Sequence, residues 1–224
     1  ISADGKDGAW VKTPLVPQID LPADYRRALA TEKDSDDRAG LLIEAATWLG
    51  DDALPLLREA LPGEDDESAS LVVKDLCRRP EEEQGRALRA EVMGHVAGKP
   101  GLKTAEEGLS CAVLSHDPAA ARPFAEALGA MICEAKTGSA AKEAARALWR
   151  VSRLAAESKA GSELGAVDAA AATKLPLCER AERRVLLSMM TKQPVGLADL
   201  ELGLSDDELG DEIVSHVDAE KVES

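Results

Sequence analysis

The sequence predicts an all-α protein, built as a superhelical stack of about five antiparallel helix pairs. Composition is the first reason: hydrophobic residues make up 45% of the 224 residues but aromatic residues only 2%, so the core must consist of Ala, Leu, Val, Ile and Met. Ala and Leu favour helices, whereas strands are enriched in β-branched and aromatic side chains. The chain also contains no Asn, and therefore no Asn-Gly turn of the kind typical of β-hairpins.

A repeated helix–turn–helix pattern is the second reason. Residues 36–61 form two amphipathic segments around a tight turn at Gly50, and residues 104–128 repeat the pattern more loosely around Asp117. One helix pair cannot bury its apolar face alone, so repeated pairs must stack. An irregular helical bundle is the alternative fold. The turns recur roughly every 30–40 residues, as in helical-pair repeats, near Asp51, Pro80, Asp117, Ala156 and Pro194.

The chain divides into one helical-repeat domain, residues 22–217, with a segment on either side. Residues 1–21 are punctuated by prolines, which disfavour helix in the preceding residue, so we expect an extended strap along the first helices. Residues 218–224 form a charged tail. The first helix is expected over 22–31, with proline in its first turn and Asp20 as its cap.

The later helices follow from apolar residues spaced three and four apart. Acidic residues 34–37 place negative charge at the start of a helix over 36–49, and its return helix covers 53–61. Thr104-Glu107 and Ser205-Glu208 match the capping box, the second opening a final helix to about Val217. Further helices are expected around 71–76, 81–96, 104–114, 119–134, 140–157, 169–172 and 178–191.

The acidic surface bounds the partners. A net charge of −15 repels phosphates and anionic lipids, so we expect no nucleic-acid binding. A protein partner with a basic face would suit this charge, and plain solubility is the alternative explanation. No apolar run approaches the ~20 residues that span a bilayer, so no transmembrane segment is expected.

Four cysteines leave two interpretations open. They form no Cys-x-x-Cys or Cys/His cluster, which argues against zinc. They are either buried free thiols or two disulfides formed in an oxidising compartment, with Cys77 facing Cys111 and Cys133 facing Cys178 on neighbouring helices. The start at Ile1 resembles a processed end, and with the prolines it favours a bacterial cell envelope or periplasm over the cytoplasm.

The histidines do not suggest a catalytic site. His95, His116 and His216 are far apart in sequence, and His116-Asp117 fits turn chemistry better than a base with its orienting carboxylate. No phosphate loop, nucleophile motif or metal motif is present. We therefore expect no catalytic residue, no metal site and no cofactor.

Arginine and tryptophan supply the candidate partner-binding residues. Arg146, Arg150 and Arg153 share one helical face and could grip a carboxylate or phosphate, or pair with acidic neighbours across the stack. Trp48 and Trp149 are expected in the core, but if exposed they would be interface anchors. A second basic stripe comprises Arg180, Arg183 and Arg184.

Residues 36–61 resemble a HEAT-type repeat, especially the bacterial kind. Residues 104–128 match in part, through Ala112, Leu114, Asp117 and Leu128. The resemblance implies a non-catalytic scaffold or accessory subunit of a larger assembly, because such families mostly bind proteins and a minority are enzymes. The alternative is a helical-repeat enzyme or small-ligand-binding protein, which a deep pocket would favour. The matching features of the first repeat are Arg38, Ala45-Ala46, Leu49-Gly50-Asp51, Ala53-Leu54-Pro55, Leu57 and Ala60-Leu61.

Overall fold

The computed structural model describes residues 20–79, 83–158 and 161–215. Every regular element in these ranges is helical and none is a strand, which confirms the all-α prediction. Residues 210–215 are also helical. The α-helices are α1 (Leu21–Thr31), α2 (Ser35–Leu49), α3 (Leu54–Ala60), α4 (Asp66–Arg78), α5 (Glu83–Val96), α6 (Leu102–Leu114), α7 (Pro118–Glu134), α8 (Gly138–Glu157), α9 (Gly161–Ala172), α10 (Ala181–Met190) and α11 (Leu197–Leu204).

Three sequence expectations concern the ends of the chain. The strap predicted over 1–21 lies outside the described residues up to 19, and Leu21 already begins α1. His216 and the tail over 218–224 also lie outside the described part.

Aspartate side chains begin several helices. Asp34 accepts hydrogen bonds from the backbone N–H groups of Asp36 and Asp37 at 3.0 and 3.2 Å, as an N-cap does. Four further aspartates accept from backbone N–H groups two or three residues later: Asp20, Asp65, Asp117 and Asp206. Part of the acidic composition therefore serves helix initiation in a chain that lacks Asn.

Neither predicted capping box forms. Helix α6 begins at Leu102, and Asp66 of α4 accepts from the backbone N–H groups of Lys103 and Thr104 at 2.8 and 2.9 Å. The carboxylate of a neighbouring helix thus replaces the local cap. Ser205 ends α11, and Asp206 takes the capping role instead.

One helix is longer than the sequence predicted, and another was not predicted. Helix α9 covers Gly161–Ala172, so it includes Gly161 and Gly165 and begins well before the segment expected over 169–172. It packs against α7, and that tertiary contact outweighs the low helix propensity of glycine. Helix α11 was not predicted at all.

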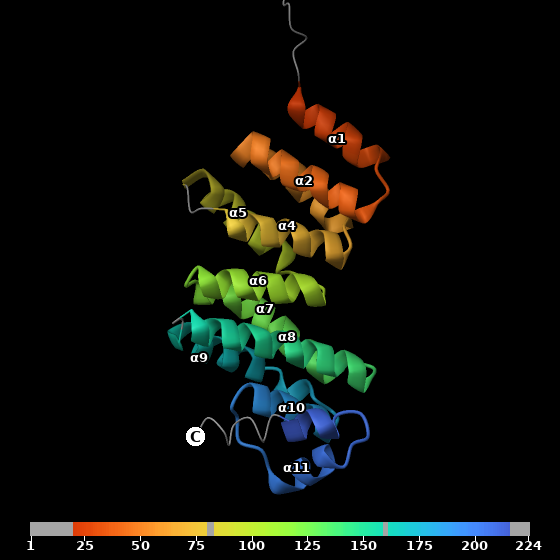
Figure 1. The fold of residues 1–224 in the computed structure, drawn as a ribbon, viewed down its shortest axis with the longest axis vertical. Helices are drawn as coiled ribbons and strands as arrows, with labels where there is room; N and C mark the ends of the chain where they lie inside the picture. Colours follow the sequence, from red (N-terminus) through yellow and green to blue (C-terminus); the bar gives the residue numbers. More distant parts are fainter. Residues whose placement is uncertain (1–19, 80–82, 159–160, 216–224) are drawn as a thin grey trace, which may run out of the picture.

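The helices follow one another along the longest dimension of the molecule (Figure 1). Helix α2 packs on α4, α4 on α6, and α6 on α8, and these four form one layer. Behind it, α3 contacts α5, and α7 contacts both α9 and α6. Helices α10 and α11 pack together at the last end, where α10 also contacts α7 and α8.

Polar contacts between the helices recur at one sequence separation. In four of them the partners are 33 residues apart, which matches the length of a helical-pair repeat. The spacing joins α1 to α3, α3 to α5, α2 to α4, and α4 to α6. The contacts are Arg26–Glu59 (3.3 Å), Arg58–Glu91 (2.8 Å), Ser68 Oγ–Ser35 O (2.9 Å) and Lys74–Glu107 (3.0 Å).

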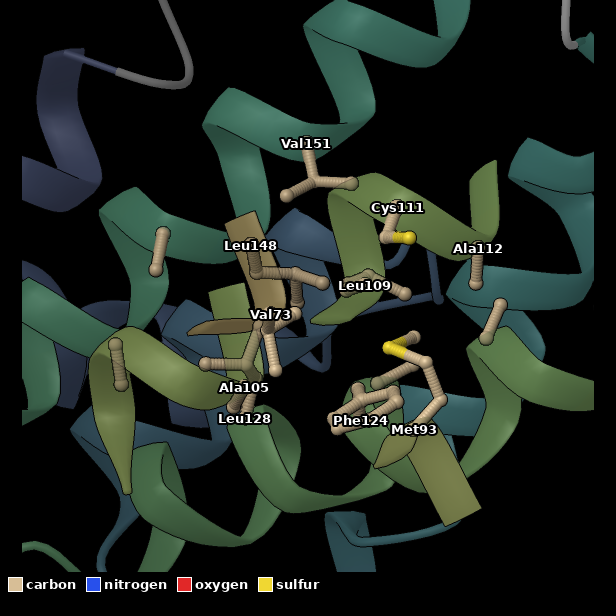
Figure 2. Packing of buried hydrophobic residues seen from close by; sticks show 14 of the residues in the cluster. Val73, Met93, Ala105, Leu109, Cys111, Ala112, Phe124, Leu128, Leu148 and Val151 are labelled. Atoms are coloured by element: carbon tan, nitrogen blue, oxygen red, sulfur yellow. The ribbon is translucent and has the colours of Figure 1, made fainter. Parts of the chain in front are cut away.

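The core is continuous and built largely from alanine and leucine. Small residues bring the helices close: a Cβ added at Gly108 would lie 2.6 Å from the ring of Phe124, and one at Gly129 would lie 2.6 Å from the carbonyl oxygen of Ala171. Phe124 is fully buried among aliphatic side chains (Figure 2). The small side chains that replace aromatic residues in this core therefore allow the helices to pack closely.

Candidate functional site

Both candidate tryptophans lie at the surface, so their expected place in the core was wrong. Trp48 is 74% exposed and Trp149 is 40% exposed. Helix α2 buries Ala39 and Ala46, and Trp48 lies about 160–180° around the helix from both, away from the middle of the buried face. Large exposed indoles are typical anchors of protein interfaces.

The arginine cluster of α8 is paired with carboxylates. Arg146 donates to both carboxylate oxygens of Glu212 at 3.1 and 2.9 Å. Arg150 donates to both oxygens of Glu106 at 2.5 and 2.6 Å, and these bonds raise the pKa of Arg150. Arg146 and Arg150 thus pair with acidic residues of other helices, as one of the two interpretations of this cluster expected.

Arg153 differs slightly from its two neighbours. It donates to Glu157 at 3.0 Å, one turn along the same helix. Its guanidinium carbon also lies 5.1 Å from the centre of the Trp149 ring, a cation–π distance. Arg153 therefore supports the exposed indole, and both residues belong to one surface feature.

The second basic stripe does not form a common surface. Arg184 donates to the carbonyl oxygen of Cys178 at 2.9 Å and lies 3.3 Å from Asp199, while Arg180 contacts Glu182 at 3.4 Å. Arg183 is buried, and its Nε and Nη2 atoms have no hydrogen-bond partner among the described residues. An anion could not reach all three together.

The cysteines meet in two pairs. Cys77 of α4 is bonded to Cys111 of α6, with their Cα atoms 5.6 Å apart. Cys133 of α7 is bonded to Cys178, which precedes α10, with their Cα atoms 4.3 Å apart. Each bridge ties two helical segments that are 34 or 45 residues apart in sequence. These pairings are the ones that the sequence left as an alternative to free thiols.

A cleft of about 700 Å³ lies between α5 and α7, closed at its base by the end of α6. Its apolar walls include Met93, Ala112 and Phe124 (Figure 2), and its polar residues include Arg86 and Arg89. The sequence analysis did not identify it. Small residues spaced along α5 are the only local signal, and they equally suit close helix packing.

A second hollow, of about 570 Å³, is acidic but its carboxylates are already used. Glu64 accepts from Arg38, Asp65 accepts from the Ser68 N–H, and Asp66 caps α6. Among the described residues, no three His, Cys, Asp or Glu side chains are grouped to hold a metal ion. This hollow is therefore explained by helix capping and ion pairing.

The last helices expose several apolar side chains. Leu197 is 80% exposed, and three neighbours in sequence or fold are also exposed. They are Leu202, Leu204 and Val214. Exposed apolar side chains are stabilised when a partner removes them from water, so this end of the molecule is a candidate contact surface.

Comparisons with known proteins add no assignment. No family model, curated protein or solved structure matches the chain. None of the helices in the described ranges has both the length and the apolar character of a membrane-crossing segment.

Proposed function

We propose that the chain is a HEAT-like α-solenoid of about five helix pairs that acts as a non-catalytic scaffold or accessory subunit and binds a protein partner. The exposed Trp48 and Trp149 carry this proposal. A tryptophan that becomes buried when a partner binds is among the commonest strong anchors of a protein interface. The 33-residue spacing of inter-helix contacts supports the repeat architecture.

The charge distribution fits the same role. Many of the charged side chains in the structure form ion pairs between helices. The net charge of −15 would orient a basic partner and raise its encounter rate. Affinity would come from apolar burial at the tryptophans.

A pull-down from native extract tests the proposal. The unchanged chain is expected to retain a stoichiometric protein partner, and a Trp48→Ser/Trp149→Ser variant is expected to lose it. A Thr47→Ser variant, which changes an exposed neighbour only slightly, controls for the handling of the protein. Equal retention by the tryptophan variant, or no stoichiometric partner for the unchanged chain, would contradict the scaffold role.

The second candidate function is binding of a small ligand, which the 700 Å³ cleft favours. Location in a bacterial cell envelope is a further proposal, supported by the two disulfide pairings. Thiol titration with and without reductant tests the pairing: no thiol should react before reduction and four after it.

A further inference from the structure

The cleft between α5 and α7 has the size and lining of a small-molecule site. Its volume of about 700 Å³ falls within the range of roughly 300–1,000 Å³ for ligand pockets. Met93 from α5, Ala112 from α6 and Phe124 from α7 are all buried members of the core. The apolar walls are therefore fixed by the packing of three helices.

Two guanidinium groups belong to the same wall. Arg86 and Arg89 are three residues apart on α5 and so share a face. Arg89 is only 9% exposed, and its Nη2 donates to the carbonyl oxygen of Arg79 at 3.1 Å, which holds the side chain in place. Arg86 is exposed and makes no ion pair with any residue that the structure describes. Positive charge therefore faces an otherwise apolar cleft.

Among the lining residues that the structure describes, the one carboxylate already has a structural role. Asp117 Oδ1 accepts hydrogen bonds from the N–H groups of Ala119 and Ala120 at 3.1 and 3.0 Å, where it caps α7. Its negative charge is compensated by the positive end of that helix. The described lining thus combines apolar walls with two guanidinium groups, although the chain as a whole has a net charge of −15.

We propose that this cleft binds a small amphiphilic carboxylate. The apolar body of the ligand packs against the accessible alanines of α5 and α7 and against Pro123, above the buried Met93 and Phe124, and its carboxylate accepts charge-assisted hydrogen bonds from Arg86, with Arg89 behind it. A cation with the same apolar body meets repulsion at the rim. The proposal concerns a different part of the molecule from the tryptophan surface and does not depend on the scaffold role.

Titration calorimetry of the full chain with octanoate and with octylammonium tests this site. The two probes share one apolar chain and differ in the sign of the charge. Octanoate is expected to bind at one site, at least about tenfold more tightly than octylammonium. The Arg86→Gln variant is expected to weaken octanoate binding about tenfold, a typical effect of one charge-assisted bond. The Arg78→Gln variant changes an exposed arginine outside the cleft and should bind as before.

A second variant fills the cleft without disturbing the fold. A Cβ added at Gly94 meets no atom within 4 Å, so Gly94→Phe places a ring in the cleft and should weaken octanoate binding at least about tenfold. Gly40 of α2 is equally open and does not line the cleft, so Gly40→Phe is the matched control. Equal affinity for both probes, unchanged octanoate binding by Gly94→Phe, or no octanoate binding at millimolar concentration would each overturn the proposal.

Discussion

At the scale of single residues, Arg38 holds three segments together. Its guanidinium donates to both carboxylate oxygens of Glu64 and to the carbonyl oxygens of Leu29 and Glu32. The Glu64 side chain is only 2% exposed, and its carboxylate is paired with Arg38. Arg38→Met is expected to lower the free energy of unfolding by about 3 kcal/mol, because it leaves a buried carboxylate unpaired. Urea unfolding measures the loss.

An exposed arginine provides the control for Arg38. Arg27 pairs with Asp24 at 3.2 Å on the surface of α1, where ion pairs contribute little. Arg27→Met should therefore change the free energy of unfolding by less than about 0.5 kcal/mol. Similar losses in the two variants would show that burial of Glu64 is not the cause.

Asp168 predicts a pH dependence of stability. Burial raises the pKa of Asp168, although the positive charge of Lys192 opposes the shift, and Oδ1 has no hydrogen-bond partner in the described structure. Protonation of Asp168 therefore stabilises the folded state. This stabilisation is fully present below the pKa of Asp168 in the unfolded chain and is lost as the pH rises through its raised pKa in the folded protein. Asp168→Asn should stabilise the protein by on the order of 1 kcal/mol at pH 7 and much less near pH 4.

Chemical unfolding of both proteins across this pH range checks the prediction for Asp168. The two unfolding curves should converge as the pH falls and separate as it rises. A gain that is the same at both ends of the range would mean that the charge of Asp168 is not responsible.

At the scale of helices, Gly129 sets the distance between α7 and α9. A Cβ there would lie 2.6 Å from the backbone carbonyl oxygen of Ala171, which a small side-chain movement cannot relieve. Gly129→Ala is expected to cost about 1–3 kcal/mol of stability through overpacking. Gly40→Ala, with nothing within 4 Å, should instead stabilise by up to about 1 kcal/mol through helix propensity. Thermal unfolding should show opposite signs, and stabilisation by both changes would disprove the close approach.

The disulfides act at the same scale by joining helices. The cysteines of the α4–α6 bridge are 34 residues apart, and closing such a loop stabilises a protein by about 3–4 kcal/mol in the chain-entropy model. A Cys77→Ala/Cys111→Ala variant should lose about that much in urea unfolding without reductant. Reduction of the unchanged chain should cost at least as much. If reductant leaves the unfolding midpoint of the unchanged chain where it was, the bridges do not contribute.

Local signals in the sequence were sufficient for most of the helices. The spacing of apolar residues predicted α2 and α7 well, because each buries one face, and the prediction of Asp20 as a cap for α1 is confirmed. The cap of α6 could not be predicted, because Asp66 belongs to another helix. Helix α11 was missed because its leucines are largely exposed and give no clear buried face.

The surface features depended even more on distant contacts. Trp48 was expected in the core because indoles are usually buried, yet the alanines of α2 occupy the buried face. The cleft arises where α5 and α7 stand apart over α6, a relationship that no single segment encodes. The carboxylate partners of Arg146 and Arg150 are 66 and 44 residues away in sequence.

At the scale of the whole molecule, successive helices share one continuous Ala- and Leu-rich interior along an elongated stack (Figure 1). Such an arrangement would give the proposed scaffold a long surface for a partner, as stacked helical repeats have. Its last end, capped by α10 and α11, exposes leucines that a further partner surface could cover.

Small-angle X-ray scattering of the full chain in solution tests the stack most directly. A compact domain of this length would have a radius of gyration of about 17 Å. The elongated stack predicts a clearly larger radius and a distance distribution that is skewed, with a long tail. A symmetric distribution with a radius near the compact value would contradict the architecture on which the proposed interaction surface depends.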